Sequence, residues 1–189
     1  MFSLNSSHKF AITRIPEGTY VAIEVSHSDG FNKAPDQTFT IKNGERTSLT
    51  FTNTREVAPL TIKKVWKTSE ENTLTTAEKQ NLVNNIYFTL QDSGGNYVIA
   101  PKNSAGEYVY SSTNATLSNN GKFKLDVATN NILIKNLPTG TYTVKEVMSG
   151  KINYTADALS KSVKVVVNQT ANETFTNTRD IGSLSIVKN

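Results

Sequence analysis

Three polar side chains in this sequence lie on strand faces that are otherwise apolar: an amine, a carboxyl group and an amide. Lys64, Glu146 and Asn177 each come two residues after an apolar residue, and in a β-strand residues two apart share a face; these apolar residues are Ile62, Val144 and Phe175. Lysine and glutamate are rarely buried without a partner, because burying an unpaired charge is costly. The pattern therefore predicts that these groups meet inside the fold.

Two of the three polar residues recur in an internal repeat. PEGTYVAIEV (16–25) matches PTGTYTVKEV (138–147), so Glu24 corresponds to Glu146. LTFTNTREVAPLTIKKV (49–65) matches ETFTNTRDIGSLSIVKN (173–189), so Asn53 corresponds to Asn177 and Lys188 to Lys64. The repeating unit is about 120 residues, the size of one domain.

A chain of 189 residues cannot hold two such units. We therefore expect three parts: the C-terminal part of a preceding repeat (1–56), one complete domain (57–180) and the first strand of a following repeat (181–189). Because residues 1–56 lack the upstream strands of the repeat, we expect this part to be less rigid than the complete domain.

The elements that position these residues are expected to be short strands. A helix is predicted in TTAEKQNLVNNI (75–86) from its apolar spacing, and strands in the segments between turn signals, including 60–66, 86–92, 106–112, 121–127 and 130–137. Seven or more strands in one domain predict an all-β fold, an antiparallel β-sandwich of the immunoglobulin-like or prealbumin-like kind.

Three segments of the complete domain together resemble the Cna B-type domain, a repeat module of Gram-positive surface adhesins and pilins. They are LTIKKVW (60–66), LPTGTYTVKEV (137–147) and TFTNT (174–178). The resemblance spans 57–180, and 1–56 is similar to the second half of the same module. It implies a covalent bond between a first-strand lysine, Lys64, and a last-strand asparagine, Asn177, with the glutamate Glu146 beside them. Glu24, Asn53 and Lys188 are the equivalents in the partial repeats.

The bond that the resemblance implies is chemically reasonable. Burial disfavours charge, which favours a neutral Lys64 amine, a nucleophile, and a protonated Glu146 that can polarise the Asn177 carbonyl. The product is a side-chain amide, formed once in each molecule, so the chain is not expected to be an enzyme. The ordinary alternative is a plain sandwich, in which Lys64 reaches solvent and Glu146 pairs with another cation.

Composition excludes several other functions. The net charge is +4 without a basic stripe, so nucleic-acid binding is not expected. The chain has no cysteine and two histidines, which argues against disulfides, thiolate chemistry and a zinc site; no metal or cofactor is expected. No apolar run reaches the length of a membrane helix.

Other motifs have simpler explanations. Lys63, the rival of Lys64, lies on the opposite strand face and corresponds to Val187. APKN (100–103) resembles a pilin motif that joins subunits through its lysine, Lys102, but an exposed loop lysine is the simpler interpretation. LPTGT (137–141) resembles a sortase signal with two residues displaced, and DSGGN (92–96) is typical of a hairpin turn as well as of a calcium ligand set.

Two functions follow from the resemblance. The first is a structural stalk module of a surface adhesin or pilin, located outside the cell at the cell wall, whose partners are neighbouring repeats of the parent chain. The second is an adhesin module that binds a host extracellular-matrix protein or glycan through its loops. Exposed aromatic residues at one end, such as Tyr97, Tyr108 and Tyr110, would favour the second.

Overall fold

A computed structural model describes residues 9–68, 74–150 and 153–188 of the chain. The chain divides into two compact units, Met1–Arg55 and Glu56–Asn189. Residues 1–8 of the first predicted part and residue 189 of the third lie outside the described residues. Within the described residues, no helix has the length and apolar character needed to cross a membrane.

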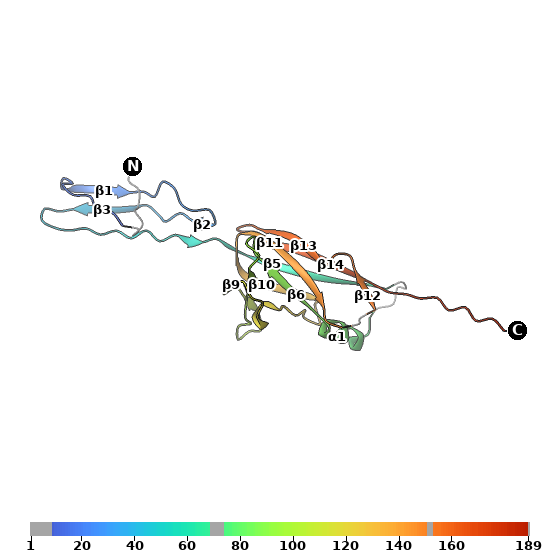
Figure 1. Ribbon diagram of the computed structural model, residues 1–189. Helices are drawn as coiled ribbons and strands as arrows, with labels where there is room; N and C mark the ends of the chain where they lie inside the picture. Colours follow the sequence, from blue (N-terminus) through green and yellow to red (C-terminus); the bar gives the residue numbers. More distant parts are fainter. Residues whose placement is uncertain (1–8, 69–73, 151–152, 189) are drawn as a thin grey trace. The chain divides into compact units, whose positions relative to one another are not determined.

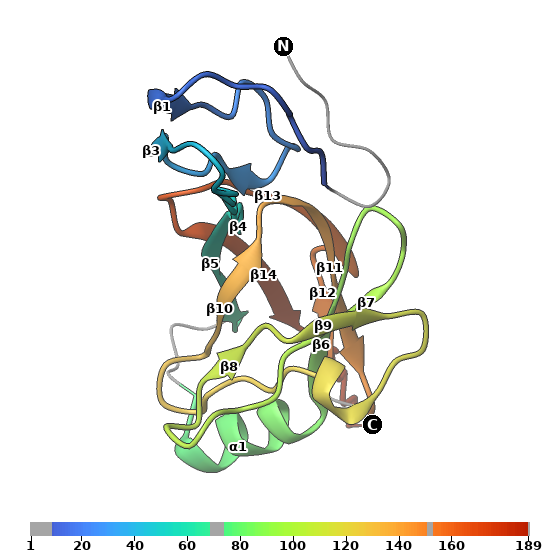
Figure 2. The ribbon, with the colours of Figure 1, turned by 90° about the vertical axis from the view of Figure 1, so that its left-hand side faces the viewer.

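The second unit is a sandwich of two five-stranded sheets (Figures 1 and 2). One sheet has the order β12-β14-β5-β10-β8 and the other the order β13-β11-β6-β7-β9. The strands of the first sheet are β5 (Val57–Lys67), β8 (Tyr108–Val109), β10 (Asn131–Pro138), β12 (Tyr154–Ala156) and β14 (Ala171–Arg179). Those of the second are β6 (Ile86–Gln91), β7 (Tyr97–Ile99), β9 (Ser112–Asn114), β11 (Gly140–Met148) and β13 (Ser160–Val165). The predicted all-β sandwich of seven or more strands is thus confirmed.

The sheet that contains β5 is mixed. β5 pairs with β14, and β8 with β10, in parallel, whereas the other pairs are antiparallel. A parallel pair needs a long crossover connection. Here the connection between β5 and β14 is nearly the whole unit, so the first and last strands lie side by side and point the same way.

Alternating residues of both sheets fill the space between them. The sharpest alternation is in β5, where Ala58, Leu60, Ile62 and Lys64 are buried. The interior includes three fully buried phenylalanines, Phe88, Phe123 and Phe175. Burial of each such side chain stabilises the fold by about 1.5–3 kcal/mol.

The predicted helix is present as α1 (Thr76–Asn84), beside the start of β6 (Figure 2). It begins at a capping box in which the Thr75 side chain accepts a hydrogen bond from the Glu78 N–H and the Glu78 carboxylate accepts one from the Thr75 N–H. The strand predicted over 121–127 is wrong: a short 3₁₀ turn, η1 (Asn119–Gly121), ends at the first residue of this segment, and within it Phe123 forms a single bridge with Phe88.

The first unit contains two short antiparallel pairs. β1 (Gly18–Ala22) pairs with β3 (Gln37–Ile41), and β2 (Phe31–Asn32) pairs with β4 (Thr54–Arg55). The pairing of β1 with β3 repeats that of β11 with β13: Tyr20 lies opposite Phe39, as Tyr142 lies opposite Val163. Among the described residues of this unit, Ala34 is the one apolar residue that is buried.

Candidate functional site

Three strands of the second unit bring Lys64, Glu146 and Asn177 together. Lys64 is on β5 and Asn177 on β14, which are neighbours in one sheet, with Asn177 opposite Trp66 in the register. Glu146 is on β11, in the facing sheet. The three residues are 4%, 1% and 0% exposed. The strand alternation that predicted inward-facing polar groups is therefore seen in the structure.

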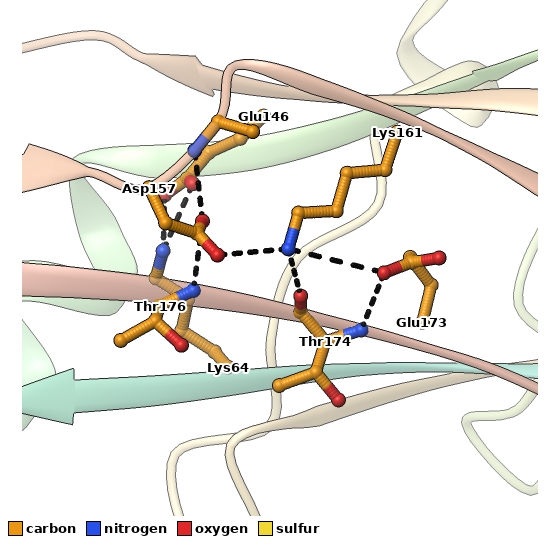
Figure 3. Close-up of polar contacts among 8 residues, drawn as sticks. Lys64, Glu146, Asp157, Lys161, Glu173, Thr174 and Thr176 are labelled. Carbon is orange, nitrogen blue, oxygen red and sulfur yellow. Dashed lines mark hydrogen bonds and ion pairs between the residues drawn. The ribbon is translucent and has the colours of Figure 1, made fainter.

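The glutamate lies between the other two side chains. Lys64 Nζ is 2.8 Å from Glu146 Oε1 and donates a hydrogen bond of 2.8 Å to Oε2. Asn177 Nδ2 donates a hydrogen bond of 2.9 Å to Oε1. The amine and the amide therefore contact the same carboxylate oxygen, Oε1 of Glu146. Figure 3 shows Lys64 and Glu146 of this cluster.

Three aromatic residues, Trp66, Phe88 and Phe175, lie near the cluster. Lys64 Nζ lies 5.0 Å from the centre of the Trp66 ring. Phe88 lies opposite Glu146 in the strand register, and its ring packs edge-on against Phe175 with centres 5.2 Å apart. A charged pair in such surroundings loses its hydration, at an effective cost of several kcal/mol per ion. The environment therefore favours the neutral amine of Lys64.

The lysine responds to this environment. Burial lowers the pKa of Lys64 from its ordinary value of 10.5, and the hydrogen bond and charge of Glu146 oppose the shift. Transfer of one proton from Nζ to the carboxylate, along a hydrogen bond of 2.8 Å, gives a neutral amine beside a carboxylic acid. A neutral amine is a nucleophile and a carboxylic acid is a proton donor.

The asparagine has an unused hydrogen-bonding atom. Asn177 Oδ1 is buried and has no hydrogen-bond partner among the described residues. An orphan acceptor of this kind costs about 1–3 kcal/mol. Once Glu146 is protonated, a half-turn of the amide about its Cβ–Cγ bond allows Oδ1 to accept the carboxyl proton. That hydrogen bond draws electrons away from the amide carbon, the atom that an amine would attack.

A second polar cluster lies beside the first and holds β14 in place (Figure 3). The Asp157 carboxylate accepts hydrogen bonds from the Thr176 N–H (3.1 Å) and from Lys161 Nζ (2.8 Å). Lys161 also contacts the Thr174 carbonyl and lies 4.9 Å from the centre of the Phe175 ring. These contacts fix the backbone on both sides of Phe175, next to Asn177. The internal repeat gives no signal for this cluster, and sequence reasoning missed it, although Lys161 shares a strand face with the buried Val163 and Val165.

The first unit contains the same glutamate–asparagine contact. Asn53 Nδ2 donates a hydrogen bond of 2.7 Å to Glu24 Oε1. The Ala34 N–H donates to both Glu24 Oε2 (2.9 Å) and Asn53 Oδ1 (3.1 Å). The hydrogen bond from Asn53, followed by that from Ala34, lowers the pKa of Glu24. Lys188, the third equivalent, is exposed in a stretch without assigned strand.

The other sequence candidates have ordinary surroundings. Lys63 is exposed on the outer face of β5. Lys102 pairs with Tyr108 in an isolated bridge, and its Nζ lies 4.9 Å from the centre of the tyrosine ring. The Asp92 carboxylate accepts hydrogen bonds from the Gly94 and Asn96 N–H groups, as in a hairpin turn. The described residues contain no group of three or more side chains that could hold a metal ion.

Comparisons with known proteins show the fold. No family model and no curated protein matches the chain. Among solved structures, the Bacillus anthracis TIE protein is similar with a TM-score of 0.57 and 20% identity, over 87% of this chain and 26% of that one. Similar structures also include Gram-positive pilins: GBS52, the minor pilin of Streptococcus agalactiae (TM-score 0.47, 14% identity, 98% and 69% covered), and the major pilin protein T3.2 of Streptococcus pyogenes (0.48, 19%, 89% and 69%). The chain spans about a quarter of the length of the TIE protein, with which it shares its fold.

The burial of Lys64 predicts a pH-dependent stability once its partner is removed. In Glu146→Ala the hydrogen bond and the charge of Glu146, which both raise the Lys64 pKa, are lost and only the charge of Asp157 still raises it, so burial lowers this pKa further. Between the lowered value and 10.5 the unfolded chain binds more protons than the folded chain, so the free energy of unfolding rises with pH across this window. Below the window the penalty for the buried ammonium is complete.

Urea unfolding at a series of pH values from about 7 to about 10 measures this slope. The matched control is the double variant Lys64→Met/Glu146→Ala, which lacks the titrating amine and is expected to show a smaller slope. Equal slopes in the two variants would mean that Lys64 does not titrate with a lowered pKa.

Proposed function

We propose that this chain is a load-bearing structural module of a bacterial surface protein, closed by an amide bond between Lys64 and Asn177. The observation that carries the proposal is the contact of a buried amine and a buried amide with one buried carboxyl group, on the facing sheets of a sandwich. The resemblance of the sequence motifs to the Cna B-type module supports the same assignment.

The reaction uses the groups already in contact. Neutral Lys64 Nζ attacks Asn177 Cγ, while protonated Glu146 donates a hydrogen bond to Oδ1. A proton then passes from the attacking nitrogen to the leaving nitrogen by way of Glu146, the bond from Cγ to Nδ2 breaks, and ammonia leaves. The product is a secondary amide, and Glu146 is regenerated. The fold supplies proximity, which can contribute about 7–11 kcal/mol to such a step.

The bond would change how force passes through the unit. A load enters at the start of β5 and leaves at the end of β14, and the two strands are parallel neighbours. With Lys64 joined to Asn177, the load passes from one strand to the other through the amide, so residues 65–176 carry none of it. By analogy with a disulfide that closes a loop of about 100 residues, the link would stabilise the folded state by roughly 4–5 kcal/mol.

This mechanical role fits a location outside the cell, on the cell wall, where neighbouring repeats of a longer chain extend the stalk. The alternative, a module that binds host protein or glycan, relied on exposed tyrosines. Tyr108 is instead half-buried, packs edge-on against Phe123 and accepts a hydrogen bond of 2.9 Å from the Lys124 N–H. This tyrosine therefore supports the core, and the stalk is the function that we propose.

The mass of the intact chain tests the bond. We expect a mass about 17 Da below that of the sequence, because one ammonia is lost for each amide formed. Lys64→Met, Asn177→Ala and Glu146→Gln are each expected to have the full mass. Lys63→Met is the matched control, since this exposed neighbour in β5 is not expected to react. A full mass for the unaltered chain, or a deficit that persists in Asn177→Ala, would refute the bond.

Single-molecule pulling tests the mechanical role. Force applied through handles at residues 57 and 180 is expected to leave the unaltered unit without a large unfolding step. Asn177→Ala is expected to lengthen by roughly 400 Å when the residues between Lys64 and Asn177 are released, at about 3.3–3.6 Å per residue. A step of that length in the unaltered chain would show that no covalent link carries the load.

A further inference from the structure

A short segment of the second unit contacts both sheets beside the buried cluster of the candidate site. This bridging segment, residues 157–161, follows β12 and includes the first two residues of β13. In one sheet, its Leu159 carbonyl accepts a hydrogen bond of 2.9 Å from the N–H of Glu146. In the other sheet, its Asp157 N–H donates a hydrogen bond of 2.8 Å to the carbonyl of Thr176 on β14. The bridging segment therefore joins the strand of the glutamate to the strand of the asparagine.

Side chains extend this contact along β14, beyond the three residues that pair with β12 (Figure 3). The Asp157 carboxylate accepts a hydrogen bond of 3.1 Å from the Thr176 N–H, and Lys161 Nζ donates one to the Thr174 carbonyl. The Glu173 carboxylate accepts a hydrogen bond of 3.0 Å from the Thr174 N–H. Hydrogen bonds that involve a charged group are stronger than neutral ones. On this edge of β14, charged side chains therefore take the place of a neighbouring strand.

The position of the bridging segment matters because the reacting groups come from different sheets. The ladder between β5 and β14 fixes Asn177 relative to Lys64, but it does not fix Asn177 relative to Glu146, which lies in the facing sheet. Lys161 pairs with Val144 of β11, two residues before Glu146, so the bridging segment is itself part of the ladder that carries the glutamate. Its hold on β14 therefore sets the separation between the two sheets at the site.

The Asn177 side chain is only lightly held by its own contacts. Its Nδ2 donates to Glu146, and its Oδ1 has no hydrogen-bond partner among the described residues. The position of the β14 backbone therefore decides where Asn177 Cγ lies relative to the amine. A misplacement of about 1 Å can slow a reaction between positioned groups by about 100-fold.

The charges of the bridging segment also act on the lysine. Burial lowers the pKa of Lys64; among the charged groups that affect this pKa, Glu146 and Asp157 raise it and Lys161 lowers it. Asp157 and Lys161 form an ion pair with a separation of 2.8 Å, so their effects on the amine oppose each other. The pair can therefore hold β14 with charge-assisted hydrogen bonds and still add no net charge beside the amine.

We propose that the bridging segment is a positioning element of the amide-forming reaction, which holds Asn177 at the distance from Glu146 that the reaction needs. This role rests on the amide of the proposed function. Asp157 and Lys161 are its positioning residues, because they act through the backbone of β14. Without the Asp157 carboxylate, the Thr176 N–H loses its acceptor and Lys161 loses its ion pair, so β14 is held less firmly to the facing sheet.

The rate of bond formation in the full chain tests this role. Each variant is recovered unfolded in urea, its full mass is verified, and it is refolded by dilution. Mass spectrometry then follows the loss of one ammonia, about 17 Da, with time. The fluorescence of Trp66, the one tryptophan of the sequence, reports folding in the same samples, so slow folding and slow bond formation can be told apart.

Asp157→Ala is expected to form the amide about 10- to 100-fold more slowly than the unaltered chain, because the Thr176 N–H loses its acceptor. Asp157→Asn keeps an oxygen acceptor for this N–H and is expected to restore a rate close to that of the unaltered chain. Lys161→Met loses the hydrogen bond to Thr174 and is also expected to react more slowly. The matched control is Lys164→Met, which replaces an exposed lysine of the same strand and is expected to leave the rate unchanged.

Equal rates in Asp157→Ala and in the unaltered chain would overturn the positioning role and leave the bond itself intact. A rate in Asp157→Asn as low as that in Asp157→Ala would also overturn it, because the effect would then come from the ion pair with Lys161 and not from the hold on Thr176. A refolded unaltered chain that keeps its full mass would instead contradict the bond of the proposed function, and with it the role of the bridging segment.

Discussion

The burial of a lysine and a glutamate between two sheets is the constraint on which the rest of this structure depends. Lys64 and Glu146 are both removed from water, and their contact of 2.8 Å offsets only part of the cost. A covalent amide would remove the ionisable amine of Lys64. The fold can tolerate so costly a group because β5 and β11 are paired with neighbouring strands on both sides, and β14 is held by its long ladder with β5 and a short one with β12. The buried pair of Lys64 and Glu146 therefore affects both the stability of the fold and the reactivity proposed for it.

The two units show what the lysine strand contributes. The glutamate–asparagine hydrogen bond forms in both, so this contact depends on the strands that both units share. Burial differs, because only the second unit has β5 and then β10 beside its last strand, and β6 beside β11 in the facing sheet. In the first unit a backbone N–H occupies the carboxylate oxygen that the lysine contacts in the second. The dry environment, which lowers the lysine pKa, therefore comes from the completed sandwich and not from the motif.

Much of this could be predicted from sequence, because the strand period fixes which side chains share a face. Alternation around Ile62 and Val144 placed Lys64 and Glu146 inside, and the repeat gave their equivalents. The parallel pairing of β5 with β14 did not follow, since alternation says nothing of strand direction. The strand predicted over 121–127 was wrong because alternation indicates only which side chains face the core. The backbone of this segment forms one isolated bridge, between Phe123 and Phe88, and no ladder. Asp157 lies between β12 and β13, where no periodic pattern applies, and Lys161 was missed although it shares a face of β13 with Val163.

Peptide mapping of the trypsin-digested chain tests the central claim most directly. An amide at Lys64 blocks cleavage there and joins the peptide 64–67 to the peptide 165–179, which contains Asn177. The account predicts one branched peptide with the combined mass of the two less one ammonia, and fragment ions that locate the branch at Lys64 and Asn177. Recovery of only the unlinked peptides 65–67 and 165–179, with cleavage after Lys64, would contradict it.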